Sequence, residues 1–173
     1  TLAVYFNTLK KMNLEEMSSY LGVVDIMNTS DSVKNSIAEA LVEQVHKNFN
    51  FKIKTSSVNG YNATVTTEIT TFDSNAILSD YQHSLDDYLA SPDSVIDGSQ
   101  KRYDKSLDLL LKSIESNTAS ATSDVDFVLI NDGTSWKLQD EGRTLGDAIF
   151  GTLTTSPLDD SSDSDSESES KKQ

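Results

Sequence analysis

The sequence predicts a single α+β domain in which a curved antiparallel sheet of about four strands packs against N-terminal helices. Residues 49–72 and 124–139 each alternate apolar and polar side chains around a turn, which is typical of β-hairpins. Most of the remaining chain repeats apolar residues at helical spacing, and two of these helices form an insertion between the hairpins at about residues 74–116. The 173 residues suit one domain, which we expect over residues 1–156, and a tail over residues 157–173.

Residues 49–72 give the clearest strand signal. The dipeptide Asn59-Gly60 separates two alternating runs, and both residues tolerate the positive φ of a tight turn. Alternation with period two places one set of side chains on a buried face and the other set in water. The expected inward set is Phe49, Phe51, Ile53, Tyr61, Ala63, Val65, Thr67 and Ile69.

Two helical regions precede this hairpin. Residues 2–21 have the pattern of a helix with a break, after which Asn13 can cap a second short helix. Residues 30–48 form a more regular helix, capped by Ser30 or Asp31, which we expect to lie across the sheet. Its apolar ridge consists of Val33, Ile37, Leu41, Val45 and Phe49, with Ala40 beside it.

The predicted insertion is a pair of helices joined by a loop over residues 93–99. Ser74 can cap the first helix, whose apolar stripe is Ile77, Leu78, Tyr81, Leu85, Tyr88 and Leu89. Pro92 favours an end to this helix, because proline excludes the helical conformation for the residue before it. The second helix runs to about Ser116, with Tyr103, Leu107, Leu110, Leu111 and Ile114 facing inward.

The second hairpin turns at Asp132-Gly133, a strong signal for a tight turn. Trp136 and Leu138 alternate on its return strand, and residues 145–153 can form a terminal helix. No residue after Leu158 is apolar, so that segment cannot build a core and we expect it to be disordered.

The charge of the chain limits its partners. The formal net charge is −14, and the body remains at about −10 without the tail. A body this acidic repels phosphate backbones and anionic membrane surfaces, so nucleic acid is not an expected partner. The absence of cysteine excludes disulfides and thiolate chemistry. The chain begins at Thr1 rather than Met, which we interpret as a chain whose signal or anchor has been removed.

The sequence offers no convincing catalytic or metal-binding group. His46 and His83 lie on predicted helices among polar neighbours, without the spacing of metal ligands, so we expect them at the surface. Asp124, Asp126 and Asp132 could form only a weak calcium site, since no loop matches the calcium-binding pattern. We therefore predict no catalytic residue, no cofactor and no metal site.

One candidate binding site comes from the aromatic residues. A set of four can line a pocket on a curved sheet, and the alternative is that these side chains belong to the ordinary core. The set consists of Tyr61, Tyr103, Phe127 and Trp136.

Three segments together resemble small secreted lipoprotein domains of Gram-positive bacteria. They read VYFNTLKKMNLEEMSSYL from Val4, SSVNGYNATVTTEIT from Ser56 and FVLINDGTSWKLQDE from Phe127. The resemblance covers roughly residues 3–140 and implies the cone-shaped fold of the nuclear transport factor 2-like and cystatin-like class. It also implies export and attachment to the membrane through a lipidated cysteine upstream of Thr1. Enzymes of the wider fold place a His–Asp or Tyr–Asp pair in the cone, and no such pair matches here.

Three functions remain open at this point. The first is a non-enzymatic binding domain at the cell surface, whose partner is an unknown protein or small ligand. The second is a small-molecule binder or enzyme that uses a pocket between sheet and helices. The third is an intracellular protein regulated by phosphorylation of the serine-rich acidic tail.

Overall fold

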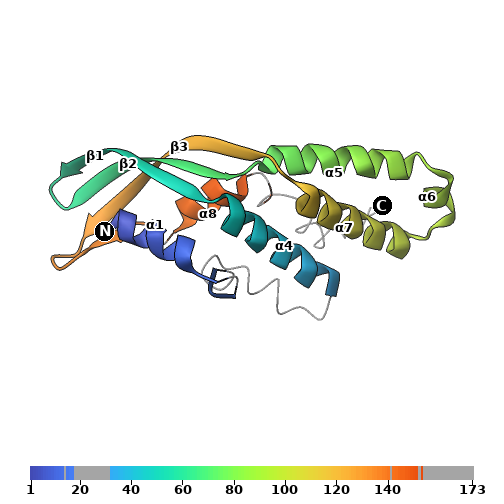
Figure 1. Ribbon diagram of the computed structural model, residues 1–173, viewed down its shortest axis with the longest axis horizontal. Coiled ribbons are helices and arrows are strands. Elements are labelled where there is room, and N and C mark those ends of the chain that lie inside the picture. The colour runs from blue at the N-terminus through green and yellow to red at the C-terminus, as the bar shows by residue number, and fades with distance from the viewer. Residues whose placement is uncertain (14, 18–31, 141, 152, 154–173) are drawn as a thin grey trace, which may run out of the picture.

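The computed structural model describes residues 1–13, 15–17, 32–140, 142–151 and 153. Within these residues the chain is elongated, with an antiparallel sheet at one end and a group of helices at the other (Figure 1). The elements in order are α1 (Leu2–Lys11), α4 (Ser32–Asn48), β1 (Asn50–Asn59), β2 (Asn62–Phe72), α5 (Ser74–Leu89), α6 (Pro92–Ile96), α7 (Ser99–Ser116), β3 (Ser120–Asn131), β4 (Trp136–Leu138) and α8 (Arg143–Phe150). The predicted fold class is confirmed.

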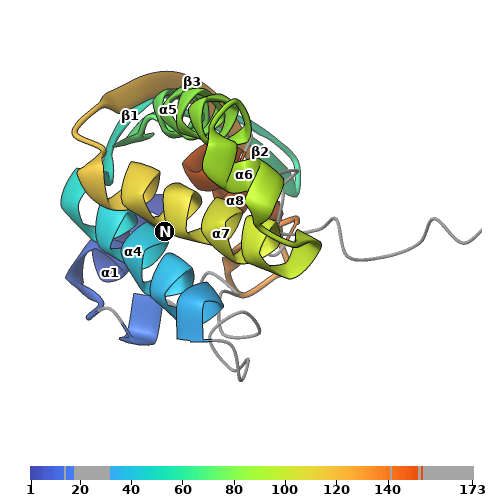
Figure 2. The ribbon, with the colours of Figure 1, turned by 90° about the vertical axis from the view of Figure 1, so that its right-hand side faces the viewer.

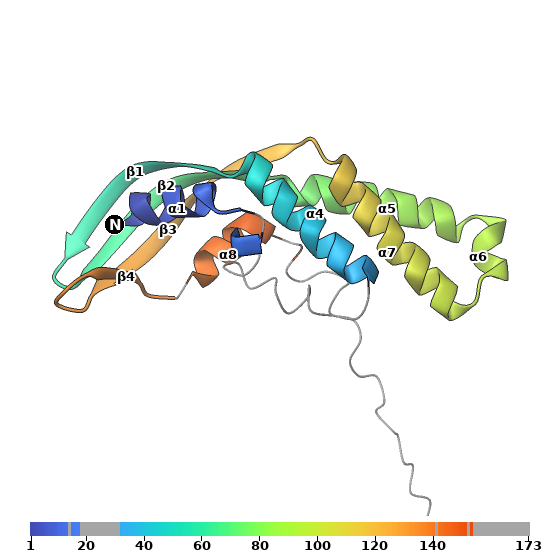
Figure 3. The same ribbon diagram turned by 60° about the horizontal axis from the view of Figure 1, so that its bottom comes forward.

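The sheet has the order β1-β2-β3-β4, and every neighbouring pair is antiparallel. Both predicted turns are present: Asn59 pairs with Asn62, and Gly60 and Gly133 take positive φ values of 62° and 94°. The sheet curves around α1, which lies within the bend (Figure 3). We call the side of the sheet that faces α1 the concave face.

Alternation along β1 is interrupted once, by a register shift between Ile53 and Thr55. A bulge of this kind leaves one residue without a partner on the neighbouring strand, and here that residue is Lys54. Its ammonium group lies 2.8 Å from Asp124 and 3.2 Å from Glu68, and these carboxylates, Asp124 first, raise the pKa of Lys54 above its ordinary value. Beyond the bulge Ser56 pairs with Val65 on the concave face.

The core between α1 and the sheet is built from phenylalanines. Phe6 of α1 is fully buried, and its ring centroid lies 5.0 Å from that of Phe51 and 5.2 Å from that of Phe127. Leu2 and Leu9, on the same helix face, are also buried. Burial of such side chains contributes about 1.5–3 kcal/mol each, so this cluster fixes α1 against the sheet.

After α1 the predicted cap at Asn13 is confirmed. The Asn13 side chain accepts a hydrogen bond from the Glu16 amide at 2.8 Å, and the Asn13 amide donates to the Glu16 carboxylate at 3.1 Å. This reciprocal pair is a capping box, which satisfies two free amides at a helix start. The rest of the predicted helix to residue 21, and the predicted caps Ser30 and Asp31, lie outside the described residues.

The predicted insertion forms the helical end of the molecule. Strand β2 leads into α5, and α7 returns into β3, so the helix pair extends the sheet lengthwise (Figure 1). Helix α4 packs against α7 (Figure 2). Gln44 of α4 is buried and donates to the carbonyl of Ile114 at 2.9 Å, while its own side-chain oxygen accepts from Asn117 at 3.1 Å. These bonds give hydrogen-bond partners to the carbonyl of Ile114 and the side chain of Asn117 at the end of α7.

Two details of the insertion differ from the prediction. The cap of α5 is Asp73 rather than Ser74, because the Asp73 carboxylate accepts from the amides of Asn75 and Ala76 at 3.0 and 3.1 Å. The expected loop over residues 93–99 contains helix α6, because Pro92 at its first position has the φ angle that a helix requires.

In the insertion, two apolar residues predicted to face inward are exposed, as are Ile53 and Tyr61 of the first hairpin, at 40% and 72%. Leu89 is 51% exposed, since Tyr88 takes the inward position and the next residue on a helix points about 100° away. Tyr103 is 40% exposed, since α7 extends beyond α4 toward the α6 tip (Figure 1).

The predicted terminal helix appears as α8 and ends earlier, at Phe150. Leu145 and Ile149 are its buried side chains, and Thr71 of β2 donates to the carbonyl of Ile149 at 3.4 Å. Among the described helices, none combines the length and apolar character needed to cross a bilayer. The predicted domain boundary after residue 156 and the predicted disordered tail lie outside the described residues.

Candidate functional site

An apolar cleft lies at the open end of the sheet, between the first turn of α1 and the concave face. It consists of two cavities of about 380 and 300 Å³. Both are lined by Thr1, Leu2, Leu129 and Trp136, so they are two parts of one depression. We call the whole depression the mouth cleft, the larger part the β4 cavity and the smaller part the β1 cavity.

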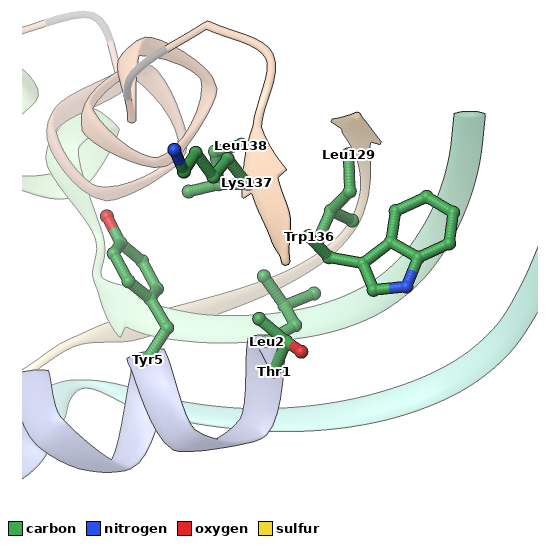
Figure 4. A pocket seen from close by; sticks show the side chains of 7 residues that line it. All are labelled: Thr1, Leu2, Tyr5, Leu129, Trp136, Lys137 and Leu138. Atoms are coloured by element: carbon green, nitrogen blue, oxygen red, sulfur yellow. The ribbon is translucent and has the colours of Figure 1, made fainter. Parts of the chain in front are cut away.

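The β4 cavity lies between α1 and the second hairpin (Figure 4). Tyr5 and Leu2 project from α1 on one side, and Leu129, Trp136 and Leu138 come from β3 and β4 on the other. The strands place these three side chains together because Leu129 pairs with Leu138 and Asn131 pairs with Trp136, all on the concave face.

The β1 cavity lies between α1 and the outer half of the first hairpin. Its sheet side is formed by Ile53, Ser56 and Val58 of β1 with Ala63 and Val65 of β2. Ile53 is 40% exposed and Val58 is 65% exposed, so these apolar side chains border open space rather than a filled core. Among the described residues, no charged side chain lines the β1 cavity.

Lys137 is the charged side chain that lines the β4 cavity, and it is already paired. Its ammonium group lies 2.6 Å from the carboxylate of Asp132. The pKa of Asp132 is held well below its ordinary value, mainly by Lys137 and to a smaller extent by hydrogen bonds from Thr134 and Ser135. The arrangement keeps the turn of the second hairpin in place, and Asp132 neutralises the charge of Lys137 from outside the lining.

The segment that leads into α8 lies next to Tyr5, on the α1 side of the β4 cavity. Asp140 accepts hydrogen bonds from the amides of Gly142 at 3.1 Å and Thr144 at 2.7 Å, and the Thr144 hydroxyl donates to the same carboxylate. These hydrogen bonds lower the pKa of Asp140, and the bond from the Thr144 hydroxyl has the largest effect. Gly142 has a φ of 96°, and a Cβ at this position would lie 3.2 Å from the hydroxyl of Tyr5. Glycine therefore allows Tyr5 to reach its place in the β4 cavity.

The four aromatic residues predicted to line a pocket do not come together. Trp136 lines both cavities. Phe127 is 1% exposed and packs on Phe6 in the core. Tyr61 is 72% exposed, because it is a turn residue and strand alternation does not extend to it. Tyr103 lies on α7, in the helical end of the molecule.

The remaining polar candidates are surface groups. His46 is exposed on α4, and the His83 side chain is 82% exposed, 3.8 Å from Asp87. Asp124 pairs with Lys54, and Asp126 accepts a hydrogen bond from Thr66. Within the described residues, no group of three or more histidines and acids could hold a metal ion.

Sequence reasoning missed Leu2, Val58 and Leu129 as site residues. Strand alternation could have placed Leu129 and Trp136 on one face, since they are on paired strands. Strand alternation could not have shown that α1 lines the cleft, because the position of α1 depends on where Phe6 packs.

The solved structures include one with a similar fold. It is the "putative lipoprotein" YcdA of Bacillus subtilis, with a TM-score of 0.52 and 17% sequence identity, and the match covers 79% of this chain and 44% of that one. At this identity the likeness shows the fold alone, and the chain spans less than half the length of YcdA. No family model and no curated protein matches the sequence.

Proposed function

We propose that this chain is a non-enzymatic, extracytoplasmic binding domain of the lipoprotein type, which binds its ligand or protein partner at the mouth cleft. The observation that carries the proposal is the cleft itself. Two connected cavities remain open at one end of a packed domain, with apolar walls and a single charged residue that is already paired. Recognition sites are typically concave and mostly apolar in this way.

A surface location is part of the same proposal. The chain shares its fold with a protein described as a "putative lipoprotein", and the resemblance of three sequence segments points the same way. In full-length form, the domain would be held at the membrane by a lipid anchor upstream of Thr1. The sheet curved around α1 supports the finer assignment to the nuclear transport factor 2-like and cystatin-like cone folds (Figure 3).

The proposal that the domain is not an enzyme rests on the lining of the cleft. Acid–base catalysis needs a titratable side chain within hydrogen-bond reach of the reacting group. Among the residues that line the two cavities, Lys137 is bound to Asp132, and Tyr5 is the other titratable side chain, with no histidine or carboxylate beside it in the lining. The remaining lining residues are apolar or carry aliphatic hydroxyl groups.

A small molecule is the second candidate ligand. The volume of the β4 cavity, about 380 Å³, falls within the range of about 300–1,000 Å³ that such sites occupy. Its open side and neutral apolar walls suit an uncharged apolar compound.

Binding of the neutral dye Nile red tests the proposal. The wild-type chain should bind the dye, and Val58→Asp should weaken binding by about tenfold, since a carboxylate in an apolar cleft disfavours an apolar ligand. Val95→Asp is the matched control, because Val95 is 83% exposed in α6 at the opposite end of the molecule. This variant should bind like the wild type. Failure of the wild type to bind, or equal binding by Val58→Asp, would contradict the proposal.

The location is tested separately in cells that produce the natural protein. We expect it in the membrane fraction, where protease added outside the cells should digest it. Protection from the external protease would contradict the surface location and favour the intracellular alternative.

A further inference from the structure

Strand β1 is an edge strand whose outer side has no neighbour among the described residues. It has ten residues and a single partner, β2. All of its side chains except that of Phe51 are exposed. An edge of this length spans roughly 33 Å and presents free amides and carbonyls that can pair with another extended chain.

The direction of the main-chain groups can be followed from one hydrogen bond. The amide of Asn131 donates to the carbonyl of Tyr61 at 2.8 Å, so this carbonyl faces β3. Main-chain groups alternate sides along a strand, so those of Asn62 face β1 and those of Ala63 face β3. Val58 pairs with Ala63, and its main-chain groups therefore face the open edge.

The same alternation applies to Ser56, two residues earlier. Ser56 and Val58 thus direct their amides and carbonyls outward while their side chains line the β1 cavity. A strand added antiparallel to β1 would place alternate side chains on this concave side, next to the cavity.

The two halves of the edge differ in how well they are protected. The inner half contains the bulge and Lys54, and bulges and lysines are common devices against unwanted strand pairing. The outer half, residues 55–59, has no charge and no register shift. Lys52, in the middle of the inner half, is exposed, and no described acidic residue forms an ion pair with it.

We propose that a partner protein adds an extended antiparallel segment to β1 along residues 55–59. Alternate apolar side chains of this segment enter the β1 cavity, and an acidic residue near its carboxyl end lies beside Lys52. The inference rests on the proposed function, since the partner uses the mouth cleft. Charge complementarity favours this occupant over a second copy, because β1 contains two lysines and no acidic residue, so the β1 strand of a second copy offers no acid to Lys52.

The test uses an eight-residue peptide with valine at alternate positions, threonine between them and aspartate near its carboxyl end. In the proposed pairing the valines face the cavity, and their amides bond to Ser56 and Val58. We expect N-methylation of the valine amides to abolish binding, and N-methylation of the threonine amides to leave it unchanged. Binding should slow amide hydrogen exchange at Ser56 and Val58 by about tenfold, as new backbone hydrogen bonds do.

A charge reversal tests the orientation. Lys52→Glu should weaken binding of the peptide by about threefold, the scale of an exposed ion pair, and should have no effect on a peptide with asparagine in place of aspartate. Val95→Asp should bind both peptides as the wild type does. An equal effect of Lys52→Glu on the two peptides would overturn the proposed orientation.

The remaining outcomes separate the two proposals. If Nile red binds and neither peptide does, the edge is not the docking site, while the mouth cleft still binds apolar ligands. If neither the dye nor a peptide binds, the proposed function fails as well. A concentration-dependent dimer with slow exchange at Ser56 and Val58 in the absence of peptide would show that a second copy occupies the edge, which would overturn the inference.

Discussion

The sheet end and the helical end of the molecule use apolar residues differently. At the helical end, α4, α5 and α7 fill the space between them, and the polar groups where α7 ends are satisfied by Gln44. At the sheet end, the β1 cavity is not filled by any described side chain, and its lining includes Leu2, Val65 and Trp136. Exposed apolar residues also occur at the α6 tip, where Val95 and Ile96 are more than four-fifths exposed.

This difference is the reason that we propose the sheet end as the binding end. Single exposed apolar residues are common on protein surfaces and need no functional explanation. A concave set with connected cavities is a less common arrangement, and it coincides here with an unpaired strand edge.

The largest expected effect comes from Phe6, which holds α1 against the sheet. Phe6→Ala should lower the free energy of unfolding by about 4 kcal/mol, because it leaves a cavity among three aromatic rings. Val4→Ala on the same helix should change it by less than about 0.5 kcal/mol, since Val4 is 68% exposed. Urea unfolding measures the change in the free energy of unfolding for each variant. Similar costs for the two variants would mean that α1 is not held by its buried face.

At the helical end the corresponding residue is Gln44. Gln44→Leu should cost about 2 kcal/mol, because it leaves the carbonyl of Ile114 and the side chain of Asn117 with fewer partners. Gln82→Leu applies the same change at an exposed position on α5 and should be close to neutral. Thermal unfolding of both proteins checks this, and Nile red binding should persist in Gln44→Leu if the two ends act separately. Loss of dye binding at a temperature where this variant is folded would contradict that separation.

Two glycines of α8, one at its N-cap and one within it, should change stability with opposite signs. Gly142→Ala should destabilise the domain by about 1–2 kcal/mol, since φ is 96° and the new Cβ would press on Tyr5. Gly146→Ala should stabilise it by about 0.5–1 kcal/mol, because this position lies within α8 with nothing within 4 Å of a Cβ. Melting temperatures distinguish the two signs. Stabilisation by Gly142→Ala would show that the contact with Tyr5 does not constrain the site.

The smallest effect concerns Asp132 and pH. Its folded-state pKa is lowered, so its charge stabilises the folded state above the ordinary value of 3.8, and this contribution declines as pH falls below that value. The melting temperature of the wild type should therefore exceed that of Asp132→Asn at pH 7, and the difference should narrow toward pH 2.5. A difference that stays constant over this range would show that the pair with Lys137 does not stabilise the second hairpin.

The elements could be predicted from local sequence, because both hairpins are defined by their own turns. Asn59-Gly60 and Asp132-Gly133 fix where the strands reverse, and alternation then assigns Phe127 and Leu129 to the concave face. The bulge after Ile53 was not predicted, and its extra residue, Lys54, forms an ion pair with Asp124, which is far away in the sequence.

The site was harder to predict than the fold. Of the four aromatic candidates, Trp136 alone lines the cleft among the described residues. Aromatic residues indicate buried surface, and without the position of α1 the sequence does not distinguish a filled core around Phe127 from an open cavity beside Trp136. The cleft lies between the first turn of α1 and the outer halves of the hairpins.

Fluorescence of Trp136 tests the central claim most directly, because it is the only tryptophan in the chain and it lines both cavities. The measurement is quenching by acrylamide with and without decanol, a neutral apolar ligand. If the mouth cleft binds apolar groups, decanol should shift the emission to shorter wavelength and protect Trp136 from quenching in the wild type and in Val95→Asp, with weaker protection in Val58→Asp. Unchanged emission and quenching at saturating decanol would contradict the assignment of the mouth cleft as the binding site.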